Sequence, residues 1–209
     1  MTERVITHAG DVEEGAAWLA RAEPRFAALI AESGPPPLKL RDEGFRELLF
    51  LIIGQQVSTA SALAIRARAD AAGLTTPEAV KAASDELLRE VGLTRPKQRY
   101  FRALAEAKID YAALRELPTD QVIATLTAVP GIGPWTAEIY AMLSLGRADV
   151  FAPADVALQE GTRMLFDLPA RPTARALRDM SEAWSPWRSV AAWALWAYYL
   201  RTKGREVTW

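Results

Sequence analysis

The stretch LTAVPGIGPWTA, residues 126–137, decides the fold of this chain. A run with helical periodicity stops at Pro130, and Pro134 is placed to open a second helix. Between the two prolines, Gly131 and Gly133 permit positive φ angles and the close approach of another backbone. The stretch therefore predicts a tight turn that joins two helices and exposes amide N–H groups where the second helix begins.

A turn of this kind suits a phosphate group. Amide donors at a helix N-terminus and the positive end of the helix dipole both attract an anion. An ordinary connection between two antiparallel helices has the same glycine-rich composition. The turn by itself leaves both interpretations open.

The rest of the chain also predicts helices. Phe45, Leu48, Leu49, Ile52 and Ile53 have the spacing of a single helix face. Prolines and glycines fall mostly between such periodic segments, and we find neither a convincing sheet nor an internal repeat. The expected fold is all-α, with helices at 11–33 (divided at Pro24), 44–53, 58–71, from Thr76, 84–91, 96–108, 119–129, from Pro134, and at 156–166, 173–184 and 186–202.

Cysteine and histidine counts exclude several kinds of site. The 209 residues contain no cysteine and one histidine. Disulfides, thiol catalysis and cysteine-ligated zinc or iron–sulfur clusters are therefore excluded. His8 is too near the N-terminus to favour a Ser-His-Asp triad, and we expect residues 1–10 to be at most an arm.

The overall charge argues against nucleic acid as a partner, but the local charge does not. The chain has 25 basic and 26 acidic residues and a net charge of −1. Residues 91–108 nevertheless have a local excess of +4, because Arg95, Lys97, Arg99, Arg102 and Lys108 stand against Glu106 alone. Amide donors bind phosphate without adding formal charge. Nucleic acid therefore stays a candidate partner, with a modest number of charged phosphate contacts.

Nothing in the sequence predicts a membrane protein. No apolar run reaches transmembrane length, and residues 1–15 are largely polar. We expect no signal peptide, no membrane partner and a cytoplasmic protein, nucleoid-associated if it is bacterial.

A second feature lies downstream of the turn. Asp155 follows the loop Asp149 to Ala154 and precedes the predicted helix 156–166. An aspartate in this position is a good helix N-cap. A catalytic carboxylate is the other interpretation, and one residue can serve both purposes.

Several motifs together resemble the helix–hairpin–helix DNA glycosylase superfamily. The hairpin is followed some twenty residues later by an aspartate, which is the family's catalytic residue. Residues 45–58 (FRELLFLIIGQQVS) and 88–97 (LREVGLTRPK) resemble two other family segments. The tryptophans at 184, 187, 193 and 196 resemble the C-terminal helix of the 3-methyladenine DNA glycosylase II group. The motifs occur in the family's order, so the resemblance covers most of the chain.

The resemblance implies an all-α architecture of two helical subdomains that flank a DNA-binding cleft. Residues 43–145 are expected to form the middle bundle that contains the helix–hairpin–helix. Residues 1–42 and 146–209 are expected to form the second subdomain.

The resemblance also implies an activity, the monofunctional excision of alkylated bases of the 3-methyladenine type in base excision repair. Family members that also cut the strand have a lysine nucleophile two residues after the second hairpin glycine, where this chain has Trp135. Asp155 is the expected catalytic carboxylate. The alternatives are a non-catalytic helix–hairpin–helix DNA-binding module and a glycosylase for a different damaged base.

Other site residues follow from the same resemblance. Trp135, Trp196 and Ile139 are the expected lining of the base pocket, and plain core packing is the alternative for the tryptophans. The expected DNA contacts are Gln55, Gln56, Gly131, Gly133, Thr136 and Lys97. Gln56 is the expected wedge that fills the space of the flipped base, and a solvated loop is its alternative.

The expected partner is double-stranded DNA that contains damaged bases, bound by a monomer. No cofactor is expected to be required, and no iron–sulfur cluster is expected. The backbone carbonyls of Thr127, Val129 and Ile132 are the expected ligands of Na⁺ or K⁺ at the hairpin.

Overall fold

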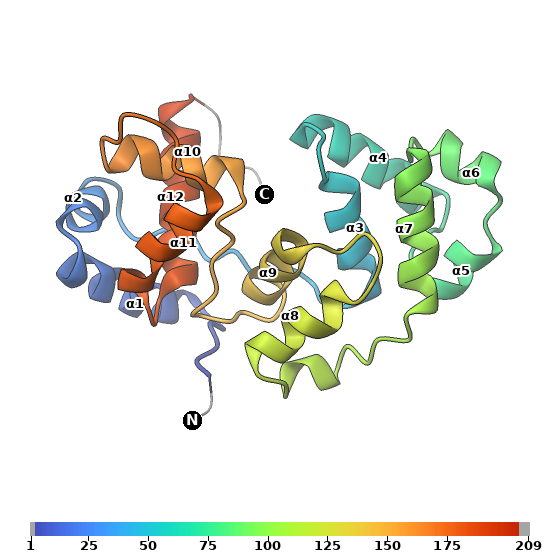
Figure 1. Ribbon diagram of the computed structural model, residues 1–209, viewed down its shortest axis with the longest axis horizontal. Helices are drawn as coiled ribbons and strands as arrows, with labels where there is room; N and C mark the ends of the chain where they lie inside the picture. Colours follow the sequence, from blue (N-terminus) through green and yellow to red (C-terminus); the bar gives the residue numbers. More distant parts are fainter. Residues whose placement is uncertain (1–2, 205–209) are drawn as a thin grey trace. The chain divides into compact units, whose positions relative to one another are not determined.

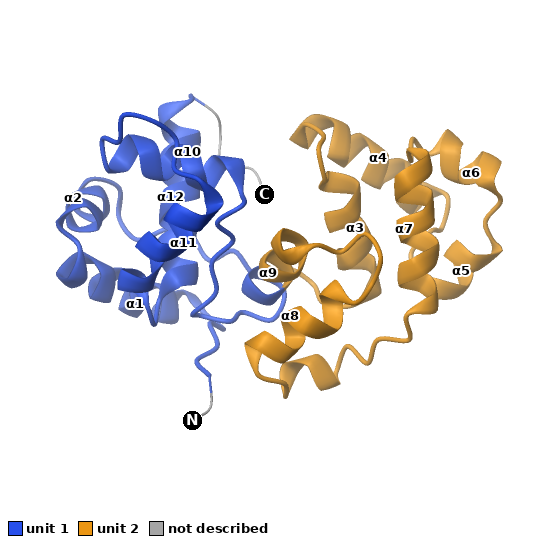
Figure 2. Ribbon diagram, viewed as in Figure 1, with its two compact units in different colours: residues 1–40, 141–209 blue, residues 41–140 orange. Residues whose placement is uncertain are grey.

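The computed structural model describes residues 3–204 and divides the chain into two compact units. Figure 2 shows unit 1, residues 1–40 and 141–209, and unit 2, residues 41–140. The division predicted from the sequence has its boundaries at 43 and 145. The structure thus places the second boundary inside helix α9 (Pro134–Leu143).

Every regular element of the described residues is a helix, so the all-α prediction is confirmed (Figure 1). Unit 1 contains α1 (Ala9–Ala22), α2 (Pro24–Ser33), α10 (Val156–Leu165), α11 (Ala174–Ser181), the 3₁₀ helix η2 (Glu182–Trp184) and α12 (Arg188–Thr202). Unit 2 contains α3 (Phe45–Gly54), α4 (Thr59–Ala71), α5 (Pro77–Ala82), α6 (Asp85–Glu90), α7 (Arg95–Glu106), the 3₁₀ helix η1 (Ala113–Arg115), α8 (Thr119–Thr127) and the first part of α9.

Helix α3 is the buried centre of unit 2. Periodicity predicts a single apolar face, but Phe50 and Leu51 are buried as well, so the prediction of one buried face was too narrow. Glu47 is buried in the same helix and accepts a hydrogen bond from Arg41 at 2.9 Å. Helices α4 and α7 pack against α3 and cover it. A helix that is enclosed by its neighbours can be apolar on all sides. The spacing of apolar residues alone therefore does not predict how many of them are buried.

Helix α12 is the centre of unit 1. Its residues Ser189–Trp196 are all buried, and α10 packs along it. A Cβ built on Gly161 of α10 would lie 2.8 Å from the Leu195 carbonyl oxygen. A larger side chain at position 161 would therefore push the two helices apart.

The N-terminal arm joins unit 1 through the backbone. Val5 and Arg147 form an isolated antiparallel bridge, in which Ile6 N donates to Gly146 O at 2.7 Å and Ala148 N donates to Arg4 O at 3.0 Å. Residues 1 and 2 of the predicted arm lie outside the described residues. The arm thus supports the loop that leads toward Asp155.

Candidate functional site

The predicted hairpin between α8 and α9 is present in unit 2. Helix α8 ends at Thr127, and Ile132 N donates to Val129 O at 3.0 Å across the turn. Only Gly131 uses the positive φ that both glycines permit; its φ is 93°, and Gly133 lies outside the left-handed region. A Cβ at Gly133 would meet nothing within 4 Å. The exposed Gly133 therefore leaves the turn open to an approaching backbone.

Gly131 is required for a second reason, its contact with α7. A Cβ built on Gly131 would lie 2.2 Å from Cγ of Tyr100. The ring of Tyr100 thus occupies the place where any other residue would have a side chain. The hairpin is fixed against α7 through this contact.

The loop after α3 holds Gln55 and Gln56, and the two side chains have different surroundings. Gln55 Nε2 donates to Gly131 O at 2.9 Å and to Thr136 Oγ1 at 3.0 Å. Gln56 is exposed and has a φ of 57°, in the left-handed region that most side chains avoid. Gln56 is therefore available to a partner, while Gln55 is engaged with the hairpin.

Lys97 is also turned into the protein. Its side chain is buried, and Nζ donates to Ile53 O at 2.6 Å and to Gln55 O at 2.8 Å. Burial lowers the pKa of Lys97, because desolvation disfavours the charged form. Thr136 is 1% exposed. Among the expected DNA contacts, Lys97, Thr136 and Gln55 thus have protein partners in this structure, whereas Gln56 and Gly133 are exposed.

Asp155 is the N-cap of α10 and is joined to α12. Its Oδ1 accepts hydrogen bonds from Leu158 N at 3.0 Å and from Trp196 Nε1 at 3.1 Å. The N-cap interpretation is therefore confirmed. The carboxylate is half-buried and is positioned by both the start of one helix and the indole of another.

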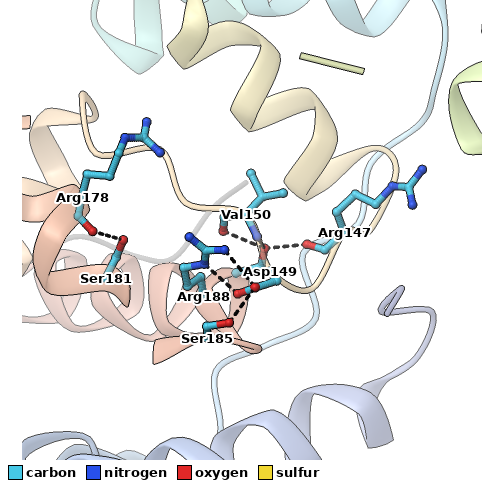
Figure 3. A network of polar contacts seen from close by, with 8 residues as sticks. Arg147, Asp149, Val150, Arg178, Ser181, Ser185 and Arg188 are labelled. Carbon is cyan, nitrogen blue, oxygen red and sulfur yellow. Dashed lines mark hydrogen bonds and ion pairs between the residues drawn. The ribbon is translucent and has the colours of Figure 1, made fainter. Parts of the chain in front are cut away.

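The loop that leads to Asp155 is attached to α12 by a network that the sequence analysis did not anticipate (Figure 3). Arg188 donates to both oxygens of Asp149, at 2.7 and 2.8 Å, and Ser185 Oγ donates to the same carboxylate at 2.8 Å. Ser189 Oγ lies 2.6 Å from Arg147 O and accepts from Val150 N at 3.3 Å. The network fixes residues 147–150 to α12.

Charge and burial act in opposite directions on Asp149. Burial favours its neutral form, but the hydrogen bonds from Arg188 and Ser185 outweigh burial and lower the pKa of Asp149. Hydrogen bonding to Asp149 correspondingly raises the pKa of Arg188, against the effect of its burial. Asp149 and Arg188 lie 39 positions apart in the sequence. No local pattern pairs side chains that far apart.

The aromatic residues divide between core and site. Trp184, Trp187 and Trp193 are fully buried core residues. Trp196 is also buried, yet its indole donates to Asp155. Trp196 thus combines the two interpretations of the sequence analysis, core packing and a place beside the candidate carboxylate.

Trp135 and Ile139 lie four residues apart on α9, which puts them on one side of the helix. Trp135 is half-buried and Ile139 is buried. Their expected place in a base pocket stays a prediction.

Comparison with known proteins gives the family of this chain. The model of the HhH-GPD superfamily base excision DNA repair proteins matches residues 49–186, which include the hairpin and Asp155. The DNA-3-methyladenine glycosylase 1 of Schizosaccharomyces pombe is 29% identical over 203 residues, which cover 93% of this chain and 89% of that protein.

Two solved structures share the fold. The S. pombe 3-methyladenine DNA glycosylase in complex with abasic DNA has a TM-score of 0.79 and 29% identity, with coverage of 88% of this chain and 95% of that one. A DNA-3-methyladenine glycosidase from Bacillus halodurans has a TM-score of 0.78 and 30% identity, with coverage of 98% and 95%. The chain described here belongs to the HhH-GPD superfamily of base excision DNA repair proteins.

Proposed function

We propose that this protein is a monofunctional DNA glycosylase. It flips an alkylated base of the 3-methyladenine type out of double-stranded DNA and hydrolyses the N-glycosidic bond, which leaves an abasic site. The observation that carries the proposal is Asp155, a carboxylate held by Leu158 N and Trp196 Nε1, at the position where the family resemblance implies the catalytic residue. The relatives named 3-methyladenine glycosylases, one of them in complex with abasic DNA, support it.

The chemistry asks for a fixed negative charge beside the sugar. As the bond between C1′ and the base breaks, positive charge develops on the sugar and the base takes the bonding electron pair. A preorganised carboxylate stabilises that charge and orients the attacking water, whose proton passes to Asp155 or to solvent. The hydrogen bonds from Leu158 and Trp196 keep the carboxylate in one position, so little reorganisation is needed during the reaction.

The leaving group needs little help from the protein. An alkylated purine such as 3-methyladenine is cationic in DNA and departs as a neutral base. A general acid is therefore unnecessary. The one histidine of the chain, His8, has another role: it caps α1 by accepting a hydrogen bond from Asp11 N.

The base pocket is the next part of the proposal. Trp135, Trp196 and Ile139 stay the candidate pocket residues that the family resemblance implies, and each favourable cation–π contact to an electron-poor base contributes about 0.5–2 kcal/mol. Flipping itself costs a few kcal/mol, so such contacts offset part of the cost.

The hairpin supplies the DNA anchor. The amides at the start of α9, near Gly131 and Gly133, would bind a DNA phosphate and so position the protein without reading sequence. The carbonyls of Thr127, Val129 and Ile132 would hold Na⁺ or K⁺. Thr127 fits the role of a cation ligand because it ends α8, and the last carbonyls of a helix have no intrahelical partner. Val129 O also accepts a hydrogen bond from Ile132 N. A bound cation would add positive charge near the phosphate.

A lyase reaction is not part of the proposal. Without an amine at position 135 the hairpin offers no nucleophile for a Schiff base. Treatment of the enzyme–DNA mixture with borohydride should therefore trap no covalent adduct. A trapped adduct would contradict this part of the proposal.

Asp155→Asn is the decisive variant. Asparagine also caps helices well, so the fold should persist while the charge is lost. We expect alkali-labile sites in methylated duplex DNA to fall by about a hundredfold or more, while binding to abasic-site DNA persists. Equal base release by the variant and the wild type would refute the assigned mechanism.

The same assay separates the two alternatives. Release of no base from any alkylated duplex, with binding retained, would favour the non-catalytic DNA-binding module. Release of only non-alkylated lesions from a panel would favour a glycosylase for a different damaged base. Gel filtration of the free protein and of its DNA complex tests the monomer that we propose.

Between residues 3 and 204, no helix has the length and apolar character needed to cross a membrane.

A further inference from the structure

Gln55 is fixed at both its side chain and its backbone. Nε2 donates to Gly131 O at 2.9 Å and to Thr136 Oγ1 at 3.0 Å. Its carbonyl oxygen accepts from Lys97 Nζ at 2.8 Å, and its own N–H donates to Ile52 O at 3.3 Å. One residue is thus tied to the hairpin, to α7 and to the end of α3.

Lys97 is placed to hold backbone rather than to meet DNA. The residue is 8% exposed, and its ammonium lies at the C-terminal end of α3, where Ile53 O accepts at 2.6 Å. A positive charge at a helix C-terminus interacts favourably with the dipole. Burying an ammonium is costly unless it is hydrogen-bonded, and here two carbonyls accept from it. Two of the three N–H donors of the ammonium thus already have partners inside the protein.

Gln56 has a backbone conformation that needs outside support. Its φ of 57° is unfavourable for a residue with a Cβ, and such strain persists where the surroundings over-determine it. The side chain of Gln56 is exposed, so packing of its own does not supply the constraint. The hydrogen bonds made by the preceding residue, Gln55, supply that constraint.

Helix α7 connects the same loop to the hairpin. Lys97 holds the loop, and Tyr100 three residues later occupies the space above Gly131. Both contacts and the Gln55 bonds lie within unit 2. The loop and the hairpin are therefore held as one rigid piece.

We infer that Gln55, Lys97 and Thr136 are positioning residues that hold Gln56 at a fixed place relative to the hairpin amides. We call these three residues the brace. The inference rests on the proposed function in one respect, that Gln56 enters the space left by a flipped base. A wedge that is already ordered loses less conformational freedom when DNA binds. The brace therefore acts on flipping, whereas Asp155 acts on bond cleavage.

The consequence is a dependence on base pairing. A well-paired lesion is costly to flip and a mispaired one costs less. A substitution that loosens the brace should slow excision from a matched duplex. When the same lesion lies opposite a mismatched base, the variant should excise it nearly as fast as the wild type. A variant that has merely lost stability would be impaired on both duplexes alike.

Lys97→Met and Gln55→Leu test this, with Lys81→Met on the exposed side of α5 as the matched control. We expect single-turnover excision from the matched duplex to fall roughly tenfold, and excision from the mismatched duplex to stay within about twofold of wild type. The control should behave as wild type on both. Equal loss on the two duplexes, or no loss on either, would overturn the inference.

Amide hydrogen exchange in the DNA-free protein gives a second readout that needs no catalysis. Amides at 54–58 should exchange roughly tenfold faster in the two brace variants than in wild type, relative to their global unfolding. Unchanged exchange there would refute the brace even in an active enzyme. If wild type released no alkylated base, the proposed function would fail, and exchange would still decide on the brace.

Salt dependence separates positioning from phosphate binding. Each neutralised phosphate contributes about 0.9 to the slope of log K against log salt. We expect Lys97→Met to keep the wild-type slope on abasic-site DNA; a slope smaller by about one would overturn the inference. Thr136→Val, which removes one acceptor of Gln55 and conserves shape, is the milder variant if the others fail to fold. It should give a smaller defect with the same pattern.

Discussion

At the scale of single residues, Gly131 meets two requirements at once. Its φ of 93° favours glycine, and the ring of Tyr100 fills the place of a Cβ. Gly133, two residues on, has open space and no such φ. His8, the one histidine, has a structural role as well, because it caps α1 in a capping box with Asp11.

Gly131→Ala should therefore be much more destabilising than Gly133→Ala. We expect a loss of about 2 kcal/mol or more for the former, from the positive φ and the clash with Tyr100, and a small change for the latter. Urea denaturation of the two variants measures the difference. Similar losses would show that the turn does not depend on Gly131 as described.

Trp135→Phe tests the base pocket at the same scale. If Trp135 lies beside the flipped position, abasic-site DNA should quench its fluorescence, and the variant should show less quenching than wild type. The other six tryptophans form the background signal and remain in the variant. Identical quenching would count against a pocket role for Trp135.

At the scale of elements, the loop 147–155 depends on α12. Asp149 is bound by Arg188 and Ser185, while Ser189 engages the loop backbone and Trp196 reaches Asp155. Four side chains along α12 and the turn before it thus place one loop. The loop's position is set by a helix that follows it by more than thirty residues.

Asp149→Asn should make this attachment measurable through pH. The pKa of Asp149 lies below its ordinary value of 3.8 in the folded protein, so its ionised form contributes stability above that value. This contribution is lost as the pH falls below 3.8 and through the folded pKa. We expect the variant to be less stable by about 1–2 kcal/mol at pH 7, and the gap to close in acid.

Asp85→Asn is the matched control for that experiment. Asp85 pairs with Arg102 on the surface of unit 2, and its side chain is 72% exposed. An exposed ion pair contributes little, so this variant should unfold like wild type at all pH values. A pH-independent gap for Asp149→Asn would contradict the assigned role of its charge.

At the scale of the whole molecule, charge alone describes DNA binding poorly. The net charge of −1 conceals the basic segment 91–108. Lys97 contributes to that segment in the sequence but not on the surface, because it is buried. Amides of the hairpin add phosphate binding that has no formal charge.

We therefore expect a shallow salt dependence of DNA binding. Four basic side chains of the segment other than Lys97 would account for a slope of at most about 4 in magnitude. Titrations of abasic-site DNA at several salt concentrations give the slope. A much steeper slope would mean that basic residues elsewhere carry the contact with DNA.

The sequence determined the elements and their chemistry because these depend on local rules. Helix periodicity, proline and glycine placed the helices within a few residues of their bounds, although the short η1 was not foreseen. Asp155 was recognisable as an N-cap, and the hairpin as a turn between helices, because caps and turns depend on neighbouring residues.

Tertiary structure alone decided which polar residues face inward. Gln55, Lys97 and Thr136 are as polar as Gln56, yet hydrogen bonds spanning 42 to 81 positions turn them into the protein. The Asp149–Arg188 pair likewise joins residues 39 positions apart. Spacing along a chain carries no information on partners at such separations, because only packing brings them within hydrogen-bonding distance.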